Sequence, residues 1–565
     1  MKMIKTIAIA TLIIMMYPSY TIAQISTDDD FLLKFAERKT IEDGKRQERV
    51  ENFIDKNRLQ KQITTQDGIS GELFDVIDEQ PVYEIPLGME QVETVRANKL
   101  WPGYDLGLNI SGAGYNKIGL WLGNSYTIYD HTEFTGRMSI EDEGGDIYTN
   151  HDTAVSGIIM GEGINANAKG IAYKCSLKVY RSDDMLSEIA LATVDGMEIS
   201  TYSWATSTCY SSFEASIDTI AYKAPYYLYC QSGGNTYTRL YGQGKNSLAV
   251  GSVYSLSTPY AGPEDVVIAN SQHGPAVDGR IKPDIMAPGG GFTATQSADA
   301  YGYLSSGGTS YSAPVAAGAG VLLQQHYQNT HSNNPMFSSD LKGLLIHTAD
   351  EAGSADGPDY YFGWGLINAR RAADLITLDS YNNNFIIDHP TLNNGSTFER
   401  VVYSDGTKPI KVTICWTDPP SYKSDCNDLT PRLINDLDLK IIKDGVSFYP
   451  WTLDPSNINS PAMNNTKNYL DNIEQVYISE PSAGTYTIQV SHDGNLSNDG
   501  YFTDGTQSFT IIDSQEKQVE ISNSPPEIEI FISTDCNSGE IIYNSDTETF
   551  NFCKDGMWIE INFSQ

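Results

Sequence analysis

The stretch from Gly308 to Val321 constrains the fold of this chain more than any other part of it. A glycine-rich turn leads into Gly308-Thr309-Ser310-Tyr311-Ser312-Ala313-Pro314, and small apolar residues then continue to Val321. A helix that is apolar on every side must be buried, so we expect Ser310 to lie at the start of a buried helix. The free N–H groups and partial positive charge of a helix N-terminus favour negative charge that develops beside this hydroxyl.

The part of the chain from residue 95 to 377 alternates short apolar runs with longer helical runs. We expect strands at 117–121, 176–180 and 247–251, and helices at 186–196, 313–327 and 339–348. Alternation of this kind predicts an α/β domain, in which a parallel sheet is covered by helices on both faces.

The pattern changes to that of a β-sandwich from residue 378 to 520. Runs such as 410–416 and 485–490 alternate apolar and polar residues, and clusters of Asn, Asp, Gly and Pro separate them, as is typical of this fold class. We interpret 522–526 as a linker and 527–565 as a small β-rich module, with strands at 541–543 and 557–561.

The N-terminal residues read as a targeting segment followed by an extension. Residues 1–23 have a basic start, a short apolar run and small residues at the end, which predicts a signal peptide cleaved after Ala23 and a secreted protein. No later segment has the eighteen apolar residues that a membrane span needs. Residues 24–94 are charged and partly helical in their spacing, and we interpret them as an N-terminal extension or a propeptide remnant.

Charge and cysteine content limit the partners that we expect. A formal net charge of −35 would repel nucleic acid and anionic lipid. We interpret the acidic surface as one that keeps an exported monomer soluble, with Asp-rich loops that bind Ca²⁺ as the alternative. Seven cysteines leave at least one unpaired, and export permits local disulfides at Cys415–Cys426 and Cys536–Cys553.

A serine nucleophile needs a base within hydrogen-bond reach, and the base needs a group that orients it. Of the eight histidines, His151 is the candidate base, because the small residues that follow it allow a helix to pack tightly. Asn235 comes after Gly233 and Gly234 and an apolar run at 226–230. Its side-chain amide could stabilise an oxyanion, although an asparagine after glycines is also typical of a turn.

Taken in order, the segments that begin at His151, Ser232 and Gly308 resemble the histidine, asparagine and serine motifs of the subtilisin-like serine proteases, the subtilases. Ser203-Trp204-Ala205 resembles the substrate-lining segment of that family, which usually ends in Gly rather than Ala. Residues 279–289 and 357–369 resemble the blocks before and after the serine, so that the resemblance covers roughly 280 residues.

The resemblance implies a subtilisin-like fold and a serine endopeptidase that requires no cofactor and acts on protein or peptide substrates. Ser310 would attack the peptide carbonyl, His151 would take and return the proton, and Asn235 would steady the oxyanion. The residues implied in substrate binding are Ser203, Trp204, Ala205, Gly233 and Gly234.

The segments 416–418 and 435–439 resemble an accessory β-sandwich of secreted subtilases. Asp436 and Asp438 point to one side of a strand. Structural calcium could bind there, and solvated or turn-bonded carboxylates are the alternative.

The subtilases carry an aspartate at the end of the first sheet strand, and this aspartate orients the histidine. Residues 131–137 resemble the family's next block, and counting back from them puts Leu122 at the position of the aspartate. Leucine cannot accept a hydrogen bond. Asp152 adjoins His151, but neighbouring side chains on a helix diverge. The other carboxylates that could take its place are Asp130, which comes eight residues after Leu122, and Glu141, Asp142 and Asp146, which we expect in a loop. Two functions stay open: a serine endopeptidase of reduced activity, and an impaired homologue (a pseudoenzyme) that binds peptides or proteins.

Overall fold

The computed structural model describes residues 32–34, 50, 62–64, 70–77, 80–84, 92–103, 107–142, 145, 147–204, 207–236, 239–256, 260–295, 301–381, 386–423, 425–498, 505–514, 541–544, 549–554 and 557–561. The chain divides into two units, Met1–Lys517 and Gln518–Gln565, which are described separately below.

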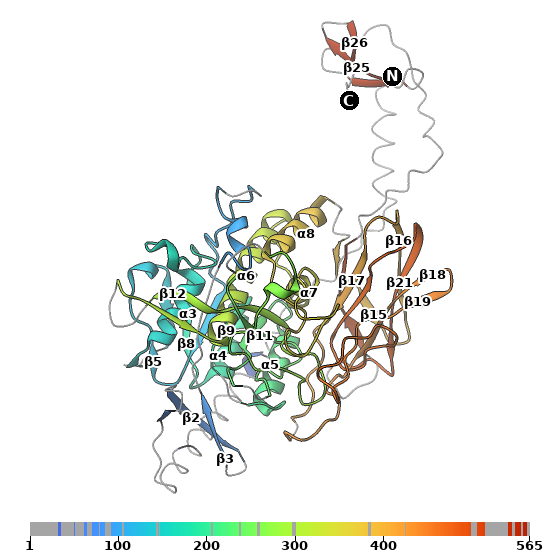
Figure 1. The fold of residues 1–565 in the computed structure, drawn as a ribbon. Coiled ribbons are helices and arrows are strands. Elements are labelled where there is room, and N and C mark those ends of the chain that lie inside the picture. The colour runs from blue at the N-terminus through green and yellow to red at the C-terminus, as the bar shows by residue number, and fades with distance from the viewer. Residues whose placement is uncertain are drawn as a thin grey trace. The chain divides into compact units, whose positions relative to one another are not determined.

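An eight-stranded sheet in the order β13-β12-β11-β10-β9-β4-β8-β6 forms the centre of the first unit (Figure 1). Seven of its strands run parallel, and only β13 is antiparallel to its neighbour. Its strands are β4 (Ile118–Leu122), β6 (Met138–Ile140), β8 (Leu177–Arg181), β9 (Ile199–Tyr202), β10 (Leu228–Ser232), β11 (Leu248–Tyr254), β12 (Ile285–Thr295) and β13 (Tyr303–Gly307). The expected parallel sheet is therefore confirmed.

Six helices surround this sheet: α3 (Asn150–Met160), α4 (Met185–Val194), α5 (Ser212–Lys223), α6 (Thr309–Thr330), α7 (Ser338–His347) and α8 (Ala369–Tyr381). Helix α6 packs along β9 to β12 and contacts α3 and α8, whereas α4 and α5 form a separate pair against β8 and β10. Every residue of α6 from Thr309 to Gln324 is buried, so the run of small residues forms the buried helix that the sequence predicts.

Several short elements lie between the strands and helices of this part of the chain. They are η1 (Ala97–Leu100), η2 (Thr132–Phe134), η3 (Ala166–Ala168), η4 (Pro263–Asp265) and the two-stranded parallel sheet of β5 (Tyr126–Thr127) and β7 (Ile147–Tyr148).

Two four-stranded antiparallel sheets follow the helices in the chain, in the orders β14-β23-β17-β20 and β16-β21-β18-β19, together with the pair β15-β22. Their strands are β14 (Ile387–Asp388), β15 (Thr391–Asn393), β16 (Phe398–Ser404), β17 (Ile410–Cys415), β18 (Asp436–Lys443), β19 (Val446–Phe448), β20 (Ile473–Ile478), β21 (Gly484–Asp493), β22 (Thr506–Ser508) and β23 (Thr510–Asp513). Inward residues of both sheets share one apolar core, which contains Ile414, Trp416 and Ile488.

These antiparallel sheets are fixed to the parallel sheet by buried contacts and a covalent bond. Helix α7 packs on β17 and β23. A disulfide joins Cys209, which follows β9, to Cys426 in the loop before β18. The expected pair Cys415–Cys426 is therefore wrong: Cys415 is a buried free thiol in β17. The sequence reasoning favoured a near neighbour, whereas packing of the two parts brings a distant cysteine to Cys426. Cys536 lies outside the described residues.

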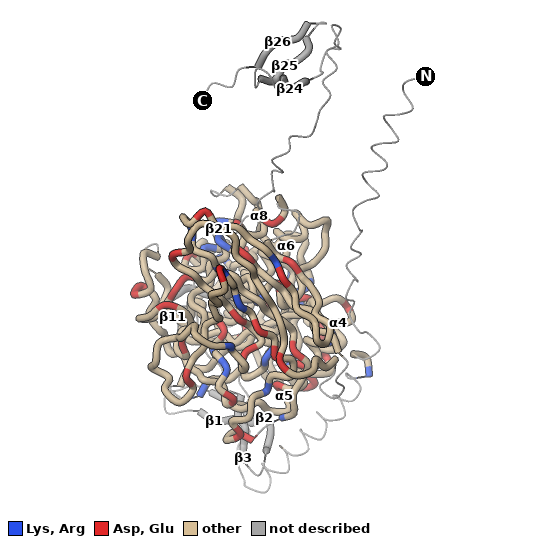
Figure 2. Tube along the Cα trace, turned by 90° about the vertical axis from the view of Figure 1, so that its right-hand side faces the viewer, with Lys and Arg blue, Asp and Glu red and all other residues tan. Residues whose placement is uncertain are grey.

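The described part of the N-terminal region includes a three-stranded antiparallel sheet of β1 (Gln62–Thr64), β2 (Ser70–Ile77) and β3 (Gln80–Glu84). The apolar residues with helical spacing lie mostly outside the described residues, as does the expected signal peptide. Acidic residues are spread over the described body in Figure 2. No described helix has both the length and the apolar character required to cross a membrane.

The second unit, considered by itself, contains an antiparallel sheet in the order β24-β25-β26. The strands are β24 (Ile541–Asn544), β25 (Thr549–Lys554) and β26 (Met557–Ile561). Two of them occupy the segments at which the sequence predicts strands.

Candidate active site

Ser310 is the second residue of α6 and is fully buried. Its Oγ donates a hydrogen bond of 2.6 Å to the backbone oxygen of Ser203, and Ser203 Oγ donates in return to the backbone oxygen of Ser310. Gly308 precedes the helix with a φ of 137°, a conformation that glycine adopts without strain. The start of α6 is therefore held against the end of β9.

His151 lies beside the two segments that hold Ser310. The residue is in the first turn of α3, and 11% of its side chain is exposed. Its ring centroid lies 5.3 Å from that of Trp204 and 5.3 Å from that of Tyr311. Because Trp204 follows Ser203 and Tyr311 follows Ser310, the predicted base packs on the immediate neighbours of the predicted nucleophile and of the residue that holds it.

Asp152 contacts the imidazole of His151 directly. Its Oδ1 lies 3.1 Å from His151 Nδ1 and also accepts a hydrogen bond of 3.2 Å from Trp204 Nε1. Its Oδ2 accepts a hydrogen bond of 2.7 Å from the hydroxyl of Thr149. The expectation that these neighbouring side chains diverge is therefore wrong.

The N-cap of α3 explains why these two side chains meet. Thr149 is the N-cap residue, and its hydroxyl also accepts a hydrogen bond of 3.0 Å from the backbone N–H of Asp152. The carboxylate consequently folds back toward the start of the helix, where the ring of His151 reaches it. The sequence signal that could have revealed this is Thr149-x-x-Asp152, a capping-box pattern.

Leu122 ends β4 and is 1% exposed. It belongs to the same apolar core as Trp204 and Tyr126. A Cβ placed on the next residue, Gly123, would lie only 2.8 Å from the Trp204 ring, so the indole packs directly on the end of this strand. An aliphatic side chain and an indole thus occupy the strand end, and the indole N–H points to Asp152.

Asn235 follows β10 and is anchored to the start of α6. Its Oδ1 accepts hydrogen bonds from Thr309 N at 2.8 Å and from Thr309 Oγ1 at 3.0 Å. The carbonyl end of the amide is therefore occupied, and the NH₂ end is the part that can donate to an oxyanion. Thr309 Oγ1 also accepts from Gly234 N at 2.9 Å.

Gly233 and Gly234 fit a narrow space beside Asn235. Gly234 has a φ of 106°, and a Cβ there would collide with the side chain of Gln272. A Cβ on Gly233 would lie 2.9 Å from Leu240. Of the predicted substrate-binding residues, Ser203, Trp204, Gly233 and Gly234 lie around the start of α6, and Ala205 lies outside the described residues.

One of the two residues considered for calcium, Asp438, forms an ion pair with a lysine. Asp436 and Asp438 lie on β18, opposite Asp493 and Ser491 on β21. Lys467 Nζ contacts Asp438 Oδ2 at 2.7 Å and Asp493 Oδ1 at 2.9 Å. Burial, with a further contribution from Asp438, raises the pKa of Asp436 to about 7. Among the described residues, no group of three or more His, Cys, Asp or Glu side chains has a geometry that could hold a metal ion.

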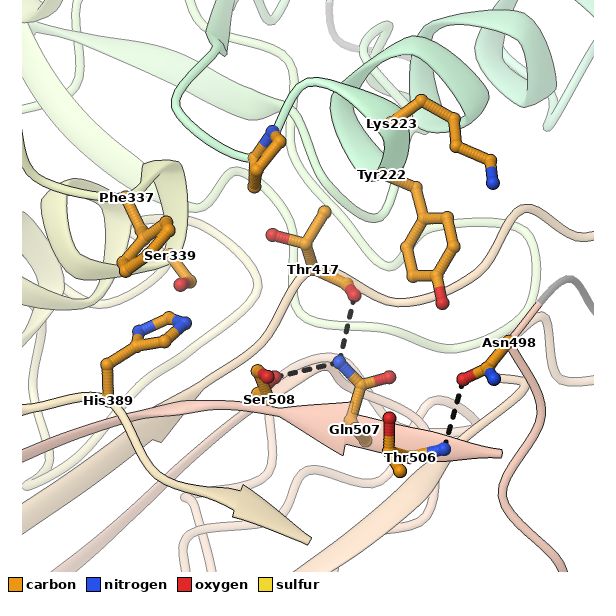
Figure 3. Close-up of a pocket in the computed structure, with 11 residues that line it drawn as sticks. Tyr222, Lys223, Phe337, Ser339, His389, Thr417, Asn498, Thr506, Gln507 and Ser508 are labelled. Atoms are coloured by element: carbon orange, nitrogen blue, oxygen red, sulfur yellow. Dashed lines mark hydrogen bonds between the residues drawn. The ribbon is translucent and has the colours of Figure 1, made fainter. Parts of the chain in front are cut away.

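A separate cavity of about 360 Å³ lies between α5, α7 and the antiparallel strands (Figure 3). Its lining includes Lys223, Phe337, His389 and Gln507 and none of the residues of the site described above. Gln507 Nε2 donates hydrogen bonds to the backbone oxygens of Thr417 and Ser508, at 3.1 and 2.8 Å. These two hydrogen bonds fix the Gln507 side chain on the side of the cavity that the antiparallel strands form.

Comparison with known proteins agrees with the resemblance to the subtilases for the central part of the chain. Residues 116–365 match the family model "Subtilase family", Peptidase_S8. The serine protease/ABC transporter B family protein tagA of Dictyostelium discoideum is 28% identical over 253 residues, which is 38% of this chain and 14% of that protein. The C5a peptidase of Streptococcus pyogenes serotype M6 is 36% identical over 141 residues, which is 23% of this chain and 12% of that protein.

These matches thus cover only a small part of the length of either curated relative. Among solved structures, the prenylagaramide maturation protease PagA superposes with a TM-score of 0.38 at 21% identity, over 46% of this chain and 94% of that one.

Proposed function

Because residues 116–365 form a domain of the subtilase family, we propose that the protein is a secreted serine endopeptidase of subtilisin type that cleaves peptide bonds through an acyl-enzyme. The observation that carries the proposal is the meeting of three groups at the start of α6. His151 packs on Tyr311, Ser310 Oγ bonds to the segment that holds Trp204, and Asn235 is fixed to Thr309.

The reaction requires the hydroxyl of Ser310 to turn from Ser203 toward His151. Ser310 Oγ then attacks the peptide carbonyl carbon while its proton passes to the imidazole. Asp152 faces Nδ1, so Nε2 is the nitrogen that takes the proton and later gives it to the leaving amine. Asn235 Nδ2 and the backbone N–H of Ser310 would donate to the oxyanion. Water completes the cycle by hydrolysing the acyl ester.

We propose an activity below that of an enzyme with the family's strand-end aspartate, because Leu122 offers no acceptor there. In subtilisin, loss of this aspartate alone lowers kcat about 3 × 10⁴-fold, roughly 6 kcal/mol, which is the full reduction expected if no other group orients His151. Residues 1–23 support secretion, and we propose a monomer that acts on protein or peptide substrates without a required cofactor.

The second candidate is a homologue that binds peptides or proteins without cleaving them. The burial of Ser310 and its hydrogen bond to Ser203 favour this candidate, because the hydroxyl is not directed at the base. Structural calcium near β18 is a further proposal that rests only on the carboxylates of Asp436 and Asp438.

A fluorophosphonate probe separates the two functions, because it reacts only with an activated serine. We expect the folded protein to be labelled at Ser310, as located by peptide mapping, and to hydrolyse a denatured protein. Ser310→Ala is the matched control and should show neither reaction. A folded wild-type protein that is not labelled and does not turn over substrate would favour the binding module.

A further inference from the structure

We propose that Asp152 replaces the missing strand-end carboxylate and orients His151 from the same turn of α3. This inference rests on the proposed peptidase function and extends it, since it assigns a positioning residue that the family pattern does not contain. The chain would then hold the imidazole by a carboxylate on the adjacent residue, in place of one on the neighbouring strand.

The contact between the two side chains has the atoms that the role requires. Asp152 Oδ1 lies 3.1 Å from His151 Nδ1, which is hydrogen-bond distance. A carboxylate at this nitrogen keeps the proton on Nδ1, so that Nε2 is the basic nitrogen. It also lies next to the positive charge that the ring gains when it takes the proton of Ser310.

The position of the Asp152 carboxylate is fixed by two further donors. Thr149 Oγ1 holds Oδ2 at 2.7 Å, and Trp204 Nε1 holds Oδ1 at 3.2 Å. The side chain is 1% exposed, so water does not compete for these bonds. A positioning group must be rigid to be effective, and here the N-cap of α3 and the end of β9 supply that rigidity.

Leu122 and Trp204 make the surroundings of this pair apolar. Leu122 is 1% exposed, and Trp204 packs over Gly123 at the same strand end. Low local polarity strengthens the attraction between an imidazolium and a carboxylate. The site therefore differs from the family pattern in two linked ways. Leu122 stands where the aspartate is expected, and Asp152 supplies the carboxylate.

Two other candidate carboxylates have different surroundings. Asp142 Oδ2 accepts a hydrogen bond from the backbone N–H of Arg181 at 2.5 Å. Asp130 is exposed, and Asp146 lies outside the described residues. The inference therefore rests on the contact that Asp152 itself makes with the ring of His151.

Asp152→Asn tests the inference, because it preserves size and hydrogen bonding but removes the charge. We expect kcat on a peptide substrate to fall about 10³- to 10⁴-fold, with KM within about twofold, since the substrate does not touch Asp152. Asp130→Asn is the matched control on an exposed carboxylate and should leave kcat unchanged. Thermal unfolding of each variant shows whether the fold is kept.

The restoring variant is Leu122→Asp combined with Asp152→Ala. It returns a carboxylate to the family position. Its kcat should be at least about tenfold higher than that of Asp152→Ala alone, a gain worth about 1.4 kcal/mol. A purely structural role of Asp152 would not be restored from the neighbouring strand.

A measurement independent of turnover uses Ser310→Ala protein, in which NMR of the ring nitrogens shows which nitrogen of His151 carries the proton. With Asp152 at 3.1 Å from Nδ1, we expect the proton on Nδ1. Asp152→Ala removes the acceptor and should shift the ring toward the form protonated on Nε2.

The outcomes separate the inference from the proposed function. If the wild type turns over substrate and Asp152→Asn stays within about threefold of it, the inference is overturned and the peptidase function stands. If the folded wild type is neither labelled at Ser310 nor active, the peptidase function fails and the inference fails with it. The same position of the proton on the His151 ring with and without Asp152 also overturns the inference.

Discussion

The ion pair between Lys245 and Asp418 predicts how strongly the antiparallel sheets stabilise the parallel sheet. Both side chains have 0% exposure. Lys245 Nζ donates to the Asp418 carboxylate, to Pro419 O at 2.6 Å and to Arg432 O at 2.9 Å. The partners are 173 residues apart in sequence, so this cluster lies at the junction of the two parts.

Replacing Lys245 with Met removes all three of these bonds and leaves the carboxylate buried. Asp418 would keep two backbone donors, Ile434 N at 2.9 Å and Asn435 N at 2.8 Å, but no cation. Removal of one partner of a buried pair costs about 3–5 kcal/mol. We expect the free energy of unfolding at pH 8 to fall by that amount.

The sign of the pH dependence provides an internal check. Burial already raises the pKa of Asp418 above its ordinary value, and Lys245 opposes this rise. Without Lys245 the pKa should rise further, so the folded variant retains a proton that the unfolded chain has released. The loss of stability in Lys245→Met should therefore be smaller at pH 5 than at pH 8.

Urea unfolding measured by tryptophan fluorescence at both pH values is the assay. Trp204 reports on the parallel-sheet part and Trp416 on the antiparallel part. Lys408→Met, a change on an exposed side chain, is the matched control and should alter stability by less than about 0.5 kcal/mol. A loss under about 1 kcal/mol in Lys245→Met at pH 8, or a larger loss at pH 5, would refute the reasoning.

Three further predictions concern the oxyanion donor, a half-buried carboxyl and the disulfide. Asn235→Ala should lower kcat by about 10²- to 10³-fold with little change in KM, because a preorganised donor to the transition state is lost; steady-state kinetics that show an unchanged kcat would contradict this role. The pKa of Asp436 is raised to about 7. Between about pH 4 and pH 7 the folded state keeps a proton that the unfolded chain releases, so stability falls as pH rises through this window. Asp436→Asn should therefore unfold at a higher urea concentration than the wild type at pH 8 and at a similar concentration at pH 4; an equal difference at both pH values would refute the assignment. Cys426→Ser opens a cross-link with a sequence separation of 217 residues and should lower the free energy of unfolding by about 5 kcal/mol. Reduction of the wild type should have the same effect, whereas Cys415→Ser should leave sensitivity to reductant unchanged.

The elements of the parallel sheet could be predicted because their signals are local. The apolar run of 117–121 became β4, and the helices predicted at 186–196 and 339–348 became α4 and α7, with ends displaced by one or two residues. Helix α6 begins four residues earlier than predicted, at Thr309, and contains Pro314 in its interior. Pro314 has no N–H for the carbonyl of Ser310, and this carbonyl accepts a hydrogen bond from Ser203 Oγ instead.

The parts that were missed depend on side-chain direction or on contacts distant in sequence. The spacing of His151 and Asp152 gives diverging Cβ atoms, and only the cap at Thr149 turns the carboxylate back to the ring. The partner of Cys426 is set by how the antiparallel sheets dock on the region after β9. Neither feature has a signal in the hydrophobic periodicity of the chain.

The order of the cysteines along the chain determines when their cross-link can form correctly. During synthesis Cys209 emerges 217 residues before Cys426, and the thiols of Cys230 and Cys415 emerge between them. In the folded protein both of these thiols are buried, and burial raises the pKa of Cys415 to about 12, which suppresses the reactive thiolate. An oxidant that met the unfolded polypeptide would find all seven cysteines of the chain accessible and could pair them wrongly. Assembly of the two sheets removes Cys175, Cys230 and Cys415 from this competition and brings Cys209 to Cys426, so the folded arrangement selects the correct pair.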